Sequence, residues 1–171
     1  ASPLLSTQYT WQYFTAKDTR QQLPDTESSP SSLASGSQTT KKFVYDLASR
    51  RLKAVFRSGF TRDISGALTA RTVGTFYFTN RPCTGVTTSD PYARTQEVHG
   101  PCEVASTAST DCDVSPGAYD QIPVSQFEYY PTSDTTFGRA GRLKSKAIFA
   151  TTTFSGSGPS CFVGNALTTT Y

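Results

Sequence analysis

Three aspartates lie close together in a stretch that has no sustained apolar period. Asp111, Asp113 and Asp120 fall within ten positions, in STDCDVSPGAYD, next to a cysteine. Carboxylate oxygens are ligands that Ca2+ prefers, and a disulfide can hold a loop of such ligands in place. The spacing is not that of an EF-hand, and solvated loop carboxylates are commoner than such sites. The sequence therefore predicts no cofactor and leaves Ca2+ open.

Enzyme chemistry has little support in the sequence. His99, in EVHGPC, is the only imidazole, and in such a cysteine-rich stretch a surface or satisfied histidine is commoner than a general base. We find no nucleophile elbow, zinc-protease motif or phosphate-binding loop. We predict that the protein is not an enzyme. A small secreted hydrolase that uses two of the scattered carboxylates stays open as an alternative.

The cysteines indicate an oxidising compartment. Their number is even, and the spacing of Cys83, Cys102, Cys112 and Cys161 is unlike that of zinc motifs. With a first residue other than Met, this pattern predicts a processed, secreted or extracellular protein with two disulfides, the alternative being a cytosolic domain with buried free thiols. Cys102 and Cys112 bracket a short run of small residues, so we expect them to pair. A Cys83–Cys161 bridge would then join distant strands and stabilise the fold by roughly 4 kcal/mol.

Two segments alternate basic and apolar residues in the manner of strands. Six cations share the polar positions of RRLKAVFR and RLKSKAIF: Arg51, Lys53, Arg57, Arg142, Lys144 and Lys146. On neighbouring strands they would form a patch for anionic lipid headgroups, sulfated glycans or nucleic acid. The alternative, which we favour, is the solvated face of an antiparallel sheet. The net charge of +3 is too small to indicate a nucleic-acid partner.

Period-two alternation also governs the other apolar segments and predicts a mainly β protein. We expect antiparallel sheets that form a sandwich, a barrel or an open half-barrel cup, with one or two short helices, the best candidate being residues 63–71. Strands 43–47 and 51–57 should be joined by a turn near Ala48 and Ser49. We expect one domain over residues 1–171, with a polar loop or flap at 17–40 and a disulfide-organised loop region at 84–121. No apolar run approaches the length of a transmembrane segment.

Many aromatic residues lie in these strand-like segments. A curved sheet lined with them could enclose a cavity for an apolar ligand, although such residues more often fill a core. The candidates for the pocket are Trp11, Tyr13, Phe43, Tyr45, Phe56, Phe76, Phe78, Phe127, Tyr129 and Phe149.

Four motifs, in this order, resemble the ependymin-related family of secreted proteins: YDLASRRLK, FYFTNRPC, IPVSQFE and CFV. The resemblance implies two stacked antiparallel sheets that form an open cup for an apolar ligand. It also implies a secreted, often dimeric protein with Ca2+ sensitivity. The chain departs from the family in lacking its N-terminal cysteine and its glycosylation sequons.

The expected function is therefore the binding of a lipid-like or other small amphiphile between the sheets of a secreted, non-enzymatic protein. The alternative is an extracellular structural or adhesive subunit. Its Thr-rich strands, such as ATTTFSG and ALTTTY, would pair with other copies of the chain by edge addition.

Overall fold

The computed structural model describes residues 6–13, 22–112, 122–149, 152–155, 158–161 and 166–171, with the backbone alone at Tyr13, 152–155 and 158–161. The strands are β1 (Gln8–Tyr13), β2 (Gln22–Pro30), β3 (Gln38–Tyr45), β4 (Leu52–Arg62), β5 (Leu68–Phe78), β6 (Glu97–Glu103), β7 (Val124–Tyr129), β8 (Leu143–Phe149), β9 (Thr152–Ser155), β10 (Gly158–Cys161) and β11 (Ala166–Thr170). Between β5 and β6 lies the short 3-10 helix η1 (Pro82–Thr84).

The prediction of a mainly β, antiparallel protein is confirmed. In the described residues, nine strands form one sheet in the order β1-β2-β3-β4-β5-β6-β7-β8-β11, and β9 pairs with β10. The sequence left a sandwich, a barrel and an open half-barrel cup as alternatives. The nine-stranded sheet is not closed, which excludes the barrel. None of the helices in the described residues has the length and apolar character needed to cross a membrane.

Contacts divide the chain into two compact units, whereas the sequence predicts one domain. Unit 1 comprises Ala1–Phe76 and Cys102–Asp113, and unit 2 comprises Tyr77–Pro101 and Val114–Tyr171. The two units are described separately below.

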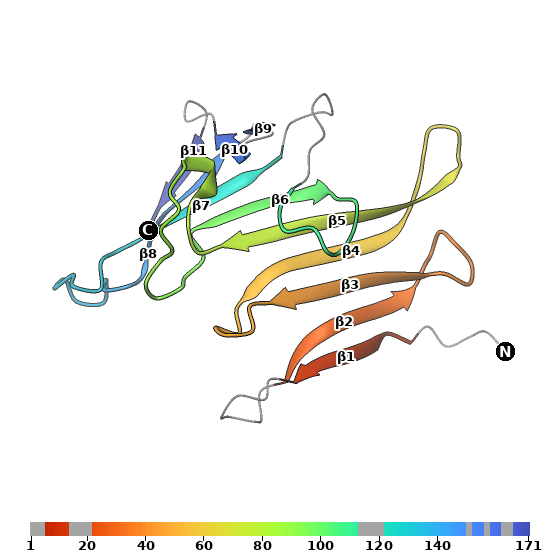
Figure 1. Cartoon of the computed structure of the whole chain (residues 1–171), viewed down its shortest axis with the longest axis horizontal. Helices are drawn as coiled ribbons and strands as arrows, with labels where there is room; N and C mark the ends of the chain where they lie inside the picture. The colour runs from red at the N-terminus through yellow and green to blue at the C-terminus, as the bar shows by residue number, and fades with distance from the viewer. Residues whose placement is uncertain (1–5, 14–21, 113–121, 150–151, 156–157, 162–165) are drawn as a thin grey trace. The chain divides into compact units, whose positions relative to one another are not determined.

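Unit 1 is a series of antiparallel hairpins in which β1 to β5 pair in chain order (Figure 1). Its core contains the rings of Phe56 and Phe76, which meet edge to face with centroids 5.6 Å apart. Gly74 of β5 lies opposite Phe56 of β4, and a Cβ at position 74 would come within 2.8 Å of the Phe76 ring. Cys102 packs against the same place, with Sγ 3.6 Å from the Gly74 carbonyl. The core therefore depends on close packing around a glycine.

The disulfide between Cys102 and Cys112 is confirmed, with the two Cα atoms 5.8 Å apart. Cys83 is also disulfide-bonded. The backbone of β10, which ends at Cys161, contacts η1, which contains Cys83. Because the Cys161 side chain lies outside the described residues, the Cys83–Cys161 pairing stays a prediction.

The expectation of a polar loop over residues 17–40 is wrong at 22–30, which form β2, and at 38–40, which begin β3. Polar residues suit a strand here because their hydroxyl groups pair across the sheet. Ser29 Oγ lies 3.0 Å from Thr39 Oγ1 on β3, and Thr10 on β1 contacts Thr26 on β2. β2 pairs with β1 over residues 22–28 and with β3 over residues 26–30, so its backbone has partners on both sides and an apolar face is not needed for strand formation.

The expectation of a helix over residues 63–71 is also wrong. The Asp63 carboxylate accepts hydrogen bonds from the backbone N–H groups of Ser65 and Ala67, at 2.8 and 2.9 Å, which closes a turn. Gly66 has a φ of 84°, which a helix does not allow, and β5 begins at Leu68. Side-chain capping therefore stabilises a hairpin at this position. The loop region expected at 84–121 likewise contains a strand, β6.

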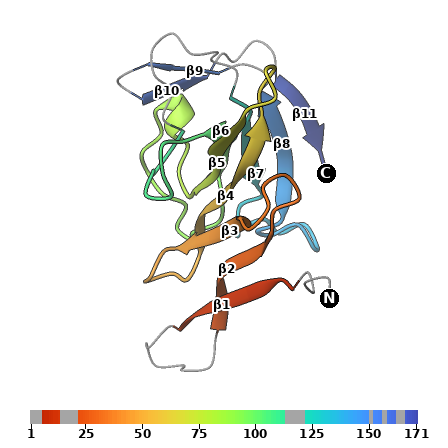
Figure 2. The same ribbon diagram turned by 90° about the vertical axis from the view of Figure 1, so that its right-hand side faces the viewer.

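In unit 2, β7, β8 and β11 lie side by side (Figure 2). Val124 on β7 is fully buried and pairs with Phe149 on β8, which pairs in turn with Ala166 on β11. Cys83 and Ala147 join this cluster. The apolar side of these three strands is therefore the core of unit 2.

Candidate ligand-binding site

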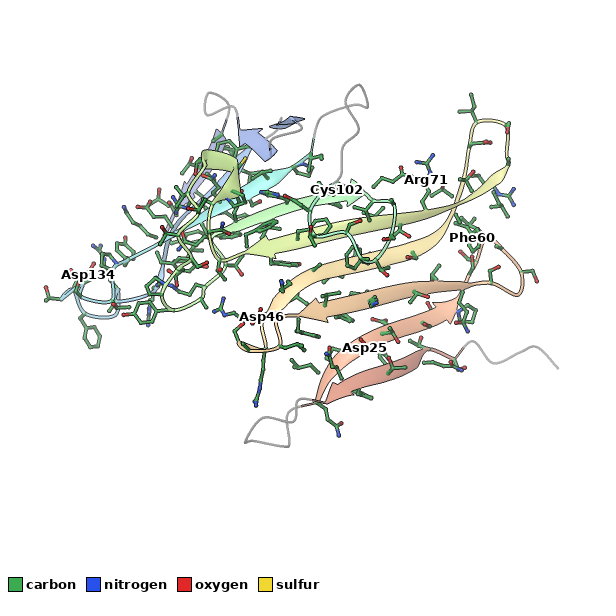
Figure 3. The ribbon with its side chains drawn as sticks, viewed as in Figure 1. Asp25, Asp46, Phe60, Arg71, Cys102 and Asp134 are labelled. Atoms are coloured by element: carbon green, nitrogen blue, oxygen red, sulfur yellow. A yellow bond between two sulfur atoms is a disulfide. The ribbon has the colours of Figure 1, made fainter. Side chains whose placement is uncertain are left out.

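A hollow of about 370 Å3 opens over β2, β3, β4 and β5 of unit 1. Figure 3 shows two of its residues, Phe60 and Arg71, toward the tip of the β4–β5 hairpin, and Asp46 at the β3–β4 turn. That turn is the predicted one, and the Asp46 carboxylate accepts the Ser49 N–H at 2.8 Å. Two hairpins with defined turns therefore set the register of the strands that carry the hollow.

The hollow exists because Gly59 interrupts a row of side chains on one face of β4. Strand alternation places Arg57 and Gly59 on the same face, and Gly59 lies opposite Arg71 on β5. A Cβ at position 59 would come within 3.2 Å of the Thr39 methyl group on β3. With Val73 of β5, these groups form a lining that is mainly carbon. A glycine in the interior of a strand often marks such a bare position, so this signal was present in the sequence.

Cations surround this apolar lining. Lys41 lies directly opposite Arg57 across β3 and β4. Lys41 Nζ is 4.0 Å from Glu27 Oε2 on β2, with both side chains 36% exposed, and Arg71 forms an ion pair with Glu103. In the part of the chain that the structure describes, no carboxylate pairs with Arg57. The hollow thus combines carbon walls with an excess of positive charge.

A second hollow of unit 1, of about 520 Å3, lies beside Ser58, Thr72 and Val104. Val104 is held there by a backbone hydrogen bond from its N–H to the Thr72 carbonyl, at 3.0 Å. The lining of this second hollow is more polar than that of the first and includes a carboxylate, Glu103. The first hollow is therefore the better candidate for an amphiphile.

The predicted aromatic pocket residues do not line either hollow. Phe56 and Phe76 fill the core of unit 1, and Phe149 belongs to the core of unit 2. Trp11 is 49% exposed, and the side chain of Tyr13 lies outside the described ones. The more common role of such residues, filling a core, explains those that are buried.

The other aromatic candidates have polar partners. Phe43 and Phe127 each lie beneath a lysine, at 4.7 Å for Lys41 and 5.7 Å for Lys146. Tyr45 Oη donates to the Pro24 carbonyl at 3.0 Å, and burial, with the nearby Asp25 carboxylate, raises its pKa.

In unit 2, Tyr129 lies under the Arg94 guanidinium, whose carbon is 4.4 Å from the ring centroid. The ring of Phe78 lies 4.5 Å from that of His99. These aromatic rings therefore support neighbouring polar groups within their own units.

The six predicted basic residues are not on adjacent strands. Three strands, β5 to β7, separate β4 from β8 in the sheet order. Lys144 Nζ is 2.8 Å from Glu128 Oε1 on β7, a contact that raises the lysine pKa and lowers the glutamate pKa. The condition for a shared patch over both strands is therefore not met. Of the six, only Arg57 lines the hollow; Arg51 and Lys53 of the same segment, and Arg142 at the start of the β8 segment, do not.

The acidic calcium candidates are only partly described. Asp111 accepts the Cys112 N–H at 2.7 Å, whereas Asp113 and Asp120 lie outside the described residues. The calcium hypothesis therefore stays a prediction.

A buried group in unit 2 was missed by sequence reasoning. Glu97 and His99 are fully buried, and their side chains meet with Oε1 2.5 Å from Nε2. The same Oε1 accepts the Cys83 N–H at 2.9 Å, and Oε2 accepts from Gln126 at 2.7 Å. Because Cys83 is in a disulfide, it offers no thiolate to a metal. We interpret the pair as structural; its i, i+2 spacing on one strand face was the available signal.

Comparisons of the chain with family models, curated proteins and solved structures found no match. The resemblance to the ependymin-related family therefore rests on its sequence motifs and stays a prediction.

Proposed function

We propose that this protein is a non-enzymatic, extracellular binder of a small amphiphilic molecule, which it holds in the hollow over Gly59. The observation that carries the proposal is this hollow, in which a bare stretch of sheet with carbon walls is bordered by cationic side chains. Its volume of about 370 Å3 lies in the range of small-molecule sites. The site is on one face of unit 1, whereas the sequence led us to expect it between two sheets.

The lining suits a molecule with an apolar body and one polar end. Val73 and the methyl group of Thr39 offer carbon surface, and the stems of Lys41 and Arg57 extend it. The charged ends of these long side chains stay near water. An apolar chain would therefore be desolvated while its polar end remained at the rim.

The extracellular part of the proposal is supported by the disulfide chemistry. Cys102 and Cys112 are bonded, and Cys83 is bonded too. Stable structural disulfides form mainly in secreted and extracellular proteins.

The test measures the binding of octanoate and 1-octanol by amide chemical shifts in NMR spectra. Gly59→Leu should abolish binding of both, because the leucine side chain would occupy the hollow. Thr169→Leu, which adds the same side chain to exposed strand β11, is the matched control and should bind normally. Should Gly59→Leu fail to fold, Val73→Ser is the second variant and should bind at least severalfold more weakly. Equal binding by all folded variants would refute the proposal.

Assembly through strand edges is a second candidate. β1 is at one end of the sheet order, and its Tyr9 and Trp11 are 53% and 49% exposed, with ring centroids 6.5 Å apart. Exposed aromatic residues on an edge strand favour pairing with another chain. Light scattering during size-exclusion chromatography should then show oligomers that Trp11→Ser disperses. A concentration-independent monomer would contradict this candidate.

A further inference from the structure

We infer that the molecule bound over Gly59 is a single-chain anionic amphiphile whose carboxylate or sulfate group is held by Arg57. This inference rests on the proposed function and specifies the chemistry of the ligand. It starts from the register of β3 and β4, which places Lys41 directly opposite Arg57.

Two like charges directly opposite each other on one face of an antiparallel pair repel. Sheets avoid such pairs or compensate them with an acidic neighbour. The acidic neighbour here, Glu27, is the cross-strand partner of Lys41 on the far side from Arg57, and its Oε2 lies 4.0 Å from Lys41 Nζ. The repulsion at Arg57 is therefore not compensated by this carboxylate.

Among the described residues, the other side of Arg57 has no compensating charge either. Its partner on β5 is Val73, an apolar residue. Arg71, the next residue on the same face of β5, forms its ion pair with Glu103. Lining the hollow are thus three cations, Lys41, Arg57 and Arg71, and one carboxylate, Glu27. A bound anion at Arg57 would offset this excess.

The side chain and its surroundings suit an oxyanion. A guanidinium presents parallel N–H donors that match the two oxygens of a carboxylate or sulfate. Arg57 is exposed, so its head is accessible to a ligand. Gly59, two residues along the same face, leaves the space in which the attached alkyl chain would lie against Val73 and the Thr39 methyl group.

The experiment compares octanoate, octyl sulfate and 1-octanol on the same protein by NMR titration. Arg57→Gln should weaken binding of both anions at least tenfold, the usual effect of losing a charge-assisted hydrogen bond, and leave 1-octanol unchanged. Arg57→Lys keeps the charge but lacks the parallel N–H donors of the guanidinium. Its affinity for the two anions should lie between that of the wild type and that of Arg57→Gln. Arg62→Gln removes a cation from the end of the same strand, outside the hollow, and should bind like the wild type. Raising NaCl from 50 to 500 mM should weaken binding of the anions alone.

The outcomes separate the inference from the proposed function. If Arg57→Gln binds octanoate and octyl sulfate as tightly as the wild type, while Gly59→Leu still abolishes binding, the inference is wrong and the hollow remains a site for amphiphiles. If Gly59→Leu changes nothing for any of the three molecules, the proposed function is wrong and the inference with it.

Discussion

Asp90 is a nearly buried carboxylate in unit 2, and we predict that Asp90→Asn destabilises the protein by about 2.5 kcal/mol at pH 7. Arg94 Nη2 donates to Asp90 Oδ2 at 2.7 Å, and Gln96 Nε2 donates to the same oxygen at 3.0 Å. The backbone N–H groups of Tyr92 and Arg94 donate to Oδ1 at 2.9 and 3.1 Å. This set of donors favours the charged form of the carboxyl group.

The magnitude follows from the pKa of Asp90, which these donors lower from 3.8 to about 2, with the Arg94 side chain as the largest cause. One pKa unit corresponds to about 1.4 kcal/mol, so the difference contributes about 2.5 kcal/mol. The Asp90 side chain is 4% exposed and that of Arg94 is 22% exposed, so solvent screens the pair little. An asparagine would lack the charge and would turn an N–H2 group toward the donors.

The pH dependence has a defined sign. Because the folded-state pKa lies below the unfolded one, the contribution is fully present above about pH 4 and is lost as the pH falls through about 2. Between pH 5 and pH 2 the wild type should therefore lose about 2 kcal/mol more than Asp90→Asn does, since other carboxyl groups titrate equally in both.

Urea denaturation, followed by circular dichroism at a series of pH values, measures both quantities. Asp134→Asn is a useful control, because Asp134 caps a turn through the Thr136 N–H rather than holding a buried cation. A loss below 0.5 kcal/mol for Asp90→Asn at pH 7, or parallel stability curves for wild type and variant down to pH 2, would refute the reasoning.

Three further predictions concern stability and covalent structure. Gly74→Ala should destabilise the protein by about 1–3 kcal/mol, because the new methyl group would lie 2.8 Å from the Phe76 ring; urea denaturation checks this, and an unchanged midpoint would contradict it. Glu97→Gln should cost about 1–3 kcal/mol, since an N–H2 group would replace one of two buried oxygens that accept from the Cys83 N–H and from Gln126; a melting temperature within 2 °C of the wild type would count against it. Peptide mapping without reduction should find Cys83 linked to Cys161, and a different linkage would overturn the pairing. Loss of this bridge should destabilise the protein by about 4 kcal/mol, against about 3 kcal/mol for loss of the Cys102–Cys112 bridge, which closes a shorter loop.

Features that depend on neighbours in the sequence could be predicted without the structure. The alternation of basic and apolar residues in RRLKAVFR is a property of one strand, and it correctly indicates β4. The turn at Ala48 and Ser49 follows from local side-chain bonding to Asp46. Cys102 and Cys112 are ten residues apart, so their pairing needs only a short loop. In each case the interacting groups are close along the chain.

The polar strand β2 could not be predicted, because nothing in its own sequence shows an apolar face. Its stability comes from backbone hydrogen bonds to strands on both sides and from cross-strand hydroxyl contacts such as that of Ser29 with Thr39. The packing of Phe56 and Phe76 into a core, rather than a ligand pocket, depends in the same way on Cys102 of β6, which packs beside Gly74. Whether a face is open or covered is decided by segments distant in sequence.

The sequence alone determined that this protein is built from antiparallel strands with polar and apolar faces, because side-chain alternation is local and has a period of two. Beyond the hairpin of β3 and β4, it did not determine which strands are neighbours. Only the tertiary structure separated β4 from β8, placed Lys41 opposite Arg57, and left Gly59 bare between Thr39 and Arg71. These relations depend on the register between strands, and a shift of one residue would turn each side chain to the other face.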